Sequence, residues 1–283
     1  DDLTTRFRAN VHHELRTPLT LMLAPLDGLL AGDYGAVEAQ VGKTLRTMHV
    51  NGQRLLKLIN NLLDLAKLES QQFEIRRAPI DLAGLLQNVV DGATPMAERK
   101  QLELRTEGLC EVPGLCADRD ALEKVVVNLV GNALKFTDAG GEIVVGMRPA
   151  PGGVEVWVRD SGVGLERDQL DRVFDRFAQV DASATRKHEG TGIGLSLAQE
   201  LVQLHEGRIW AESEGLGHGA TMRFFLPLGE SDAAVNEVVV ATAGAGEVAL
   251  AGSMQAVAAE LEAGAPASAA LRSWVFCVAA GFA

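Results

Sequence analysis

The chain has 283 residues, and 38 acidic side chains against 26 lysines and arginines give it a net charge of −12. This length accommodates about two domains of roughly 150 residues each, and a hydrophobic content of 47% excludes a largely disordered protein. The acidic balance argues against a nucleic-acid binder, because phosphate backbones recruit basic surfaces. Three cysteines, an odd number, favour free thiols in a reducing, cytoplasmic compartment over a disulfide framework.

No stretch approaches the roughly 18 apolar residues that a membrane helix needs, so we expect no membrane contact by these residues. The chain begins at Asp1 and has no signal-peptide pattern. We therefore expect a region of a longer protein, whose attachment to a membrane the sequence leaves open.

Two helical stretches come first, separated by the turn-forming Gly-Asp-Tyr-Gly of residues 32–35. Apolar residues of the second stretch recur at alternating steps of four and three, which is a heptad seam: Val41, Leu45, Met48, Gly52, Leu55, Ile59, Leu62 and Ala66. The first stretch repeats the spacing at Leu15, Leu19, Met22, Leu26 and Leu29. Pro18 predicts a local bend there. A hairpin cannot bury two such seams alone, so we expect a homodimer that forms a four-helix bundle.

From about residue 73 helices and strands alternate, which predicts a sheet faced by helices. The expected helices span residues 82–99, 118–136 and 192–206, the second opened by Asp118 as N-cap. The expected strands span residues 102–106, 142–148, 154–160, 208–213 and 220–227. After Leu228 the composition shifts to Ala, Gly, Val and Ser, typical of a linker or tail. The predicted divisions are residues 1–72, 73–228 and 229–283.

A histidine next to an acid stands on the first helix. His13 lies two residues from the apolar Leu15, about 200° around the helix, and is expected to face solvent. Glu14 follows it directly, and an acid there can hold one ring nitrogen protonated while the other acts as nucleophile. His12 lies about 100° away without an adjoining acid. Neighbouring histidines on a helix do not converge on one metal ion.

Three polar residues of the long second-domain helix recur at steps of four and three and share one face: Asn128, Asn132 and Lys135. Amide oxygens can ligate a hard cation such as Mg²⁺, and a lysine beside them can meet phosphate oxygens. Spacing alone leaves an ordinary polar helix face equally open.

Two glycine-rich turns accompany this helix. Asp160 ends a strand and precedes Gly162 and Gly164, so its carboxylate can accept a hydrogen bond from an exocyclic amine beside a closely approaching backbone. Residues 190–195, Gly-Thr-Gly-Ile-Gly-Leu, open a helix whose N–H groups can face an anion. The context of a dinucleotide-binding fold is absent, because this turn does not follow the first strand.

Residues 13–20, His-Glu-Leu-Arg-Thr-Pro-Leu-Thr, resemble the phosphoacceptor box of bacterial sensor histidine kinases. Four later motifs resemble, in order, the boxes of their catalytic ATP-binding domain: Asn128/Asn132, Asp160-x-Gly162-x-Gly164, Phe174-Asp-Arg-Phe177 and residues 190–195. The resemblance runs from about Leu3 to Leu228. It implies an α+β protein, with a helical-hairpin dimerisation domain followed by a Bergerat-type α/β sandwich. Glu189 stands where many relatives have a glycine, and in this respect the chain resembles the hybrid-kinase branch of the family.

The resemblance implies a protein histidine kinase that uses ATP and Mg²⁺ to phosphorylate His13, with Glu14 as the assisting base. The phosphoryl group then passes to an aspartate of a response-regulator receiver domain, whose dephosphorylation Glu14 and Thr17 support in many relatives. The implied nucleotide-binding residues are Asn128, Asn132, Lys135, Asp160, Gly162, Gly164, Phe174, Thr191, Gly192, Gly194 and Leu195. Of these, Asn128 and Asn132 serve Mg²⁺, and Phe174 and Phe177 flank the base of a lid near residues 178–189.

Two alternatives remain. An ATPase of the gyrase, Hsp90 and mismatch-repair superfamily would carry a glutamate base where Asn128 stands, and an amide cannot abstract a proton from water. A degenerate kinase acting as dimeric scaffold or partner-phosphatase is disfavoured by the presence of His13, Asn132, Asp160 and Gly192. The sequence leaves open the stimulus, the cognate regulator, phosphorylation within or across the dimer, and the role of residues 229–283.

Overall fold

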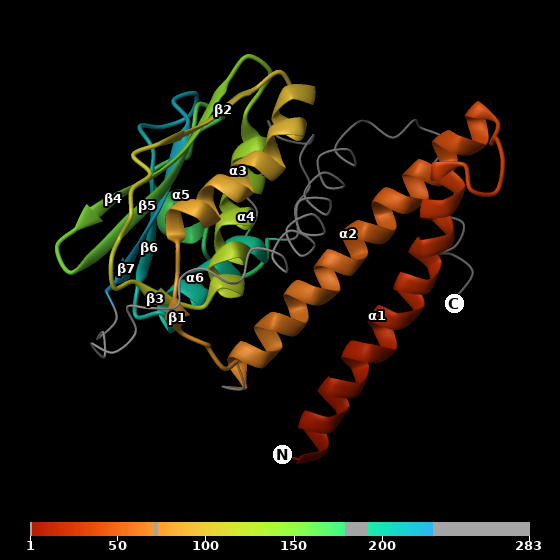
Figure 1. The fold of residues 1–283 in the computed structure, drawn as a ribbon, viewed down its shortest axis with the longest axis horizontal. Helices are drawn as coiled ribbons and strands as arrows, with labels where there is room; N and C mark the ends of the chain where they lie inside the picture. Colours follow the sequence, from red (N-terminus) through yellow and green to blue (C-terminus); the bar gives the residue numbers. More distant parts are fainter. Residues whose placement is uncertain (1, 71–72, 179–191, 229–283) are drawn as a thin grey trace.

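The computed structural model describes residues 2–70, 73–178 and 192–228, with side chains from residue 17 onward apart from Glu69. A helical hairpin comes first, made of α1 (Asp2–Ala31) and α2 (Ala39–Glu69), and an α/β sandwich follows it (Figure 1). This is the arrangement that the sequence predicts. None of the described helices combines the length and apolarity that a membrane crossing requires.

The hairpin turns at two glycines and closes around a third. Gly32 and Gly35 both adopt positive φ, at 88° and 104°, and the Gly35 N–H donates to the Gly32 carbonyl at 3.0 Å. A Cβ on Gly52 of α2 would lie 2.7 Å from a methyl carbon of Leu23 on α1, so glycine lets the two helices approach here. α1 is continuous through Pro18, so the predicted bend does not interrupt it.

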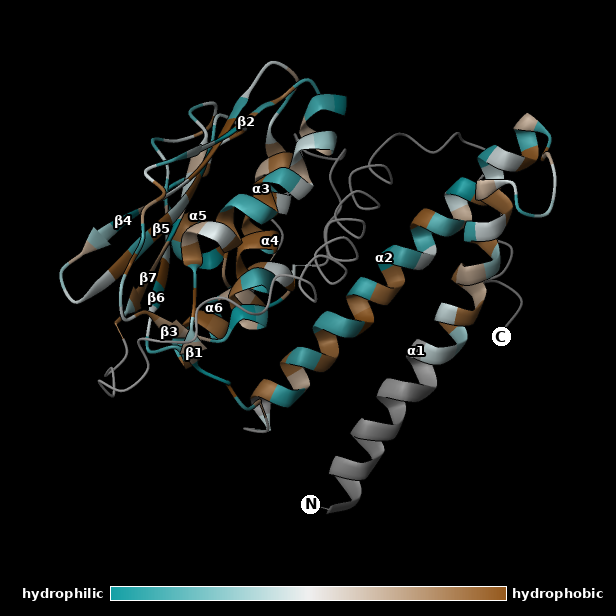
Figure 2. Ribbon diagram, in the orientation of Figure 1, coloured by the Kyte–Doolittle hydropathy of each residue, from teal (hydrophilic) through white to brown (hydrophobic). Residues whose placement is uncertain are grey.

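The hairpin leaves part of its apolar surface open. Within one chain, Leu19 and Leu23 of α1 are buried, whereas Met22 is 63% exposed. Four α2 residues, each seven positions from the next, are between 47% and 52% exposed: Val41, Met48, Leu55 and Leu62. Hydrophobic and hydrophilic residues alternate along α2 in Figure 2. We call these four residues the open stripe; they belong to the predicted seam.

The sandwich is built on a five-stranded sheet in the order β2-β4-β5-β7-β6, in which β2 and β4 are parallel and the other neighbours antiparallel. Its strands are β2 (Glu103–Glu107), β4 (Glu142–Ala150), β5 (Gly153–Asp160), β6 (Arg208–Glu212) and β7 (Ala220–Pro227). The helices α3 (Leu82–Arg99), α4 (Arg119–Phe136) and α6 (Gly194–Leu204) cover one face of the sheet (Figure 1).

The core lies between this helical layer and the sheet. Strand residues alternate between the two faces: Val154, Val156 and Val158 of β5 are buried, while the intervening side chains are more accessible. The α4 side chains of Leu122 and Leu134 are completely buried. Asp118 caps α4 by accepting a hydrogen bond from the Ala121 N–H at 3.0 Å, so its predicted role as N-cap is confirmed.

Several short elements were not predicted. β1 (Ala78–Pro79) and β3 (Cys116–Ala117) form a two-stranded antiparallel ladder, and α5 (Gln169–Arg172) is a single turn. The predicted helix 192–206 is shorter, since α6 spans Gly194–Leu204. Gly192 and Glu206 adopt positive φ, at 67° and 60°, which an α-helix does not accommodate.

The end of α2 is attached to the sandwich. Asp64 of α2 pairs with Lys124 of α4 at 2.7 Å, and its side chain is only 17% exposed. The Lys124 ammonium also lies 5.9 Å from the centroid of the Phe73 ring. Leu68 and Phe73 pack against the core of the sandwich, so α2 and the following segment are anchored on the helical layer.

Candidate functional site

Two of the three polar residues predicted on α4 lie along its more accessible side, and the third is buried. Asn128 and Asn132 are partly buried, while Val125, Val126 and Leu129 between and before them are buried in the core. Lys135 is 7% exposed, and its ammonium lies 4.8 Å from the centroid of the Phe136 ring. The spacing in the sequence therefore separates Asn128 and Asn132 from the residues that face the core, whereas Lys135 is as buried as they are.

Asn128 is oriented by its own helix. Its amide Nδ2 donates to the Lys124 carbonyl at 2.9 Å, which leaves Oδ1 as an acceptor pointing away from that bond. A Cβ on Gly194 would lie 2.8 Å from this Oδ1, so glycine allows α6 to begin directly beside Asn128. No side chain of the described residues caps the start of α6. The first N–H groups of α6, which form the positive end of its helix dipole, therefore lie beside Asn128.

The Asp160 carboxyl is held by backbone donors. Oδ1 accepts hydrogen bonds from Gly162 N–H at 2.9 Å and Ala220 N–H at 3.4 Å. Burial raises the pKa of Asp160, and the two N–H bonds act in the opposite direction. In the described part of the chain both hydrogen bonds end on Oδ1, so Oδ2 is the acceptor left for a ligand. The donor at Ala220 comes from β7, and no sequence pattern indicated it.

The turn after Asp160 rests on the end of α4. The Val163 N–H donates to the Phe136 carbonyl at 3.2 Å. A Cβ on Gly162 would collide with that same carbonyl oxygen, so a side chain has no room there. Gly164 follows with φ of 71°. The structure thus brings the Asp160 turn, α4 and the start of α6 together, although they are far apart in the sequence.

The two phenylalanines of the third motif differ. Phe174 is 5% exposed and belongs to the core, whereas Phe177 is 63% exposed with φ of 62°. The Phe177 N–H donates to the Gly192 carbonyl at 2.9 Å, which joins the two ends of the intervening segment. Leu195 is the second residue of α6 and packs at the edge of the core. Thr191 and, apart from Ala178, the predicted lid of residues 178–189 lie outside the described residues.

The predicted phosphoacceptor lies on α1. His13 and Glu14 are inside this helix, and their side chains fall outside the described part of the chain. Thr17, four residues after His13, is exposed. The nucleotide-type residues belong to the sandwich, so the two predicted groups of functional residues occupy different parts of the molecule (Figure 1).

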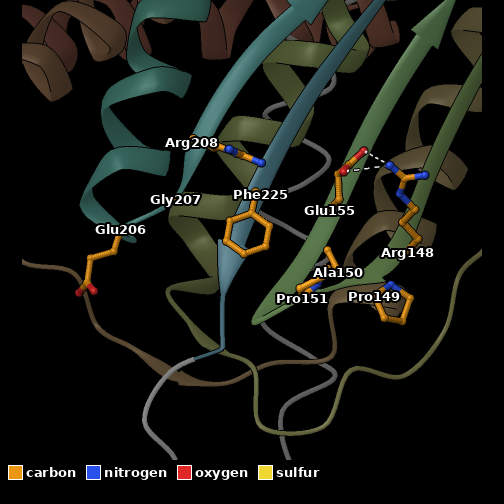
Figure 3. A pocket seen from close by; sticks show the side chains of 9 residues that line it. All are labelled: Arg148, Pro149, Ala150, Pro151, Glu155, Glu206, Gly207, Arg208 and Phe225. Atoms are coloured by element: carbon orange, nitrogen blue, oxygen red, sulfur yellow. Dashed lines mark hydrogen bonds and ion pairs between the residues drawn. The ribbon is translucent and has the colours of Figure 1, made fainter.

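A hollow of about 760 Å³ lies elsewhere, at the open face of the sheet (Figure 3). It is lined by Arg148, Pro149, Ala150, Pro151, Glu155, Glu206, Gly207, Arg208 and Phe225. Arg148 donates to both carboxylate oxygens of Glu155 at 3.1 Å. None of the predicted nucleotide-binding residues lines this hollow, so it is separate from the candidate site.

Two known protein families match the two parts of the chain. Residues 4–71 match the His Kinase A (phospho-acceptor) domain, and residues 117–230 match the histidine kinase-, DNA gyrase B-, and HSP90-like ATPase. The chain belongs to the histidine kinases. It therefore combines a phosphoacceptor domain with an ATP-binding domain of the two-component signal-transduction type.

Individual relatives support this assignment. The kinase chain is 36% identical over 233 residues to the hybrid signal transduction histidine kinase D of Dictyostelium discoideum, covering 81% of the chain and 15% of that protein. It is 37% identical over 226 residues to the histidine protein kinase DivJ of Caulobacter vibrioides, covering 79% and 37%. Full-length ShkA, solved in complex with AMPPNP, has a TM-score of 0.67 at 30% identity, covering 80% and 46%. The chain thus spans less than half the length of these relatives.

Proposed function

We propose that this kinase region transfers the γ-phosphoryl group of ATP to His13 and then to an aspartate of a response-regulator receiver domain. The observation that carries the proposal is the convergence of Asn128, the Asp160 turn and the start of α6 on one side of the sandwich. This convergence occurs in a chain whose first helix carries a histidine followed by an acid. A protein with only one of these two features would bind a nucleotide or accept a phosphoryl group, but not both.

The purine end of the nucleotide is assigned to Asp160. Oδ2 of its carboxylate accepts a hydrogen bond from the exocyclic amine of adenine, while Gly162 and Ala220 hold Oδ1. Gly162 and Gly164 let the base approach the backbone. The phosphates are assigned to Lys135, Gly192, Gly194 and Leu195, because the N–H groups at the start of α6 and an ammonium suit anionic oxygens. Thr191 belongs to this assignment from the sequence, and Phe174 supports it from the core.

Asn128 and Asn132 fit a magnesium ion. Both present neutral amide oxygens, the type of ligand that a hard cation takes, and the bond from Asn128 Nδ2 to Lys124 orients Oδ1 outward. A bound Mg²⁺ neutralises phosphate charge and favours departure of ADP. Asn128 and Asn132 then orient the phosphates for attack in line with the leaving oxygen.

His13 supplies the nucleophile. A neutral imidazole nitrogen attacks the γ-phosphorus, the bond from phosphorus to the bridging oxygen of ADP breaks, and the other ring nitrogen gives its proton to Glu14. The product is a phosphoramidate on His13. Transfer to the receiver breaks this nitrogen–phosphorus bond and forms an acyl phosphate on the aspartate. Thr17 and Glu14 are assigned to orient water when the partner is dephosphorylated.

The dimer is assigned to the hairpin. The open stripe of α2 repeats every seven residues and stays about half exposed in one chain. This pattern is typical of an apolar seam that a second copy of the chain buries. We therefore propose a homodimer through residues 1–72, an ATP-binding domain at residues 73–228 and a separate segment at residues 229–283. No nucleic acid or membrane contact is assigned to these residues.

An experiment with γ-labelled ATP and Mg²⁺ tests the proposed reaction. We expect label on the wild-type chain that acid removes and alkali leaves, and no label on His13→Gln. Release of labelled phosphate without labelled protein would favour the ATPase alternative. Nucleotide binding without turnover would favour the scaffold.

A further inference from the structure

The carboxyl end of α4 is held by a lysine from another helix. Lys100, the C-cap of α3, donates from Nζ to the Leu134 carbonyl at 2.5 Å and to the Thr137 carbonyl at 3.5 Å. The last four carbonyls of an α-helix have no partner inside the helix. A cation at this end also meets the negative end of the helix dipole. Lys100 therefore serves the same helix that carries Asn128, Asn132 and Lys135.

Two other carbonyls at this helix end have donors of their own. Ala133 accepts from the Thr137 N–H at 3.1 Å and from its hydroxyl at 2.7 Å. Phe136 accepts from the Val163 N–H in the turn after Asp160, at 3.2 Å. The carbonyls that Lys100 serves thus flank the one on which the Asp160 turn rests. If the last turn of α4 moved, this turn would move with it.

The ammonium of Lys100 is committed to these carbonyls. Burial lowers the pKa of Lys100, and the charge of Asp138 acts in the opposite direction. Among the residues that the structure describes, Lys100 forms no ion pair with a carboxylate. A partly buried ammonium without such a pair loses hydration, which its hydrogen bonds and the nearby charge of Asp138 offset. Its energetic effect is therefore concentrated on the end of α4.

We propose that Lys100 is a positioning residue for nucleotide binding. By fixing the last turn of α4, it holds Lys135 in place relative to the Asp160 turn. Lys135 can then contact the phosphates while Asp160 contacts the purine of the same nucleotide. The inference rests on the proposed nucleotide site, and Lys100 itself touches no part of the nucleotide. Its removal raises the dissociation constant for the nucleotide without changing the reacting groups.

The test compares Lys100→Met, Lys100→Arg and the matched α3 variant Val89→Ala in the full chain. Val89 is completely buried in the core and its side chain makes no hydrogen bond, so its truncation lowers the melting temperature without removing a hydrogen bond at the end of α4. The probe is AMPPNP with Mg²⁺, measured by titration calorimetry. We expect Lys100→Met to raise the dissociation constant about tenfold, the usual effect of leaving buried carbonyls without a donor. Lys100→Arg keeps a donor and stays within about threefold of wild type, and Val89→Ala binds as wild type.

Amide hydrogen exchange supplies a second readout. The Val163 and Thr137 amides should exchange faster in Lys100→Met and at the wild-type rate in Val89→Ala. Unchanged nucleotide affinity in Lys100→Met would overturn the proposal. If Lys100→Met does not fold, Lys100→Ala replaces it, since alanine also lacks a side-chain donor, and wild-type affinity there overturns the proposal in the same way.

Asn132→Ala separates this proposal from the nucleotide site itself. If Asn132→Ala loses nucleotide binding while Lys100→Met binds as wild type, only the role of Lys100 is wrong. If Asn132→Ala also binds as wild type, the proposed nucleotide site is wrong.

Discussion

The hairpin and the sandwich solve the same burial problem differently. The sandwich encloses its core within one chain: Leu122 of α4 and Phe224 of β7 are completely buried between helices and sheet. The hairpin leaves Leu55 and the rest of the open stripe about half exposed. The proposed nucleotide site therefore stands on a framework complete in one chain, whereas the helix of the proposed phosphoacceptor belongs to a hairpin whose open stripe we propose a second copy covers. We therefore expect the stability of the sandwich to be independent of protein concentration, whereas the association of two hairpins should depend on it.

The largest expected effect is on the core of the sandwich. Leu122→Ala should lower the free energy of unfolding of this region by about 2–5 kcal/mol, because a completely buried leucine leaves a cavity. Denaturant unfolding measures this, and the loss should not depend on protein concentration. Leu216→Ala, at a leucine that is 58% exposed, is the control and should shift stability by less than about 0.5 kcal/mol. Equal losses in the two variants would contradict the proposed division.

A charge on the open stripe tests whether the helical hairpin forms the dimer interface. Leu55→Glu should raise the dissociation constant of the dimer about 100-fold, since the two-fold axis places two buried charges in one seam. Sedimentation at several concentrations measures the effect. The matched control is Leu21→Glu, at a residue of α1 that is 68% exposed and outside the predicted seam. A Leu55→Glu chain that dimerises like wild type would place the interface elsewhere.

The N-cap of α4 gives a smaller effect. Asp118 accepts from the Ala121 N–H at 3.0 Å and from the Arg76 N–H at 2.9 Å. Asp118→Ala should therefore cost about 1 kcal/mol of sandwich stability. Asp168 precedes α5 without a side-chain cap, so Asp168→Ala should cost far less. Thermal unfolding compares the two variants, and a larger loss for Asp168→Ala would refute the capping role.

The smallest expected effect depends on pH. His205 is buried, accepts from the Asp118 N–H at Nε2, 3.0 Å away, and contacts the Leu201 carbonyl through Nδ1. Burial lowers its pKa below the ordinary value of 6.5. The unfolded chain then binds more protons, so the contribution is complete above pH 6.5 and is lost as pH falls toward the folded pKa. Between pH 7 and pH 6 the loss is at most about 0.7 kcal/mol.

Unfolding at several pH values checks this prediction. His205→Gln should flatten the dependence between pH 7 and pH 6, and His218→Gln, at an exposed histidine, should keep it. An unchanged dependence in His205→Gln would assign the titration to another group.

Local sequence patterns predicted much of the fold. The helix predicted at residues 82–99 is α3, because its apolar period and caps are local signals. β1 and β3 were missed because two residues form no pattern, and the parallel pairing of β2 with β4 is set by packing between distant segments. Pro149 and Ala150 lie outside the predicted strand 142–148 but extend β4, where Pro149 lies opposite Val154.

The candidate site likewise has features that local sequence predicts and features that only contacts between distant segments create. The spacing of Asn128 and Asn132 and the strand end at Asp160 are local, and the sequence predicted both. The approach of Gly194 to Asn128, the Ala220 donor to Asp160 and the role of Lys100 arise from contacts between distant segments. A single sequence contains no signal for these contacts, because each depends on how α3, α4, α6 and β7 pack.

Peptide mapping of the phosphorylated chain tests the central claim most directly. The chain is incubated with ATP and Mg²⁺, digested at alkaline pH and analysed by mass spectrometry, with Asn132→Ala as control. We expect one phosphoryl group, located on His13, and none in Asn132→Ala. A phosphoryl group on His12, or phosphate release from a chain that stays unmodified, would contradict it.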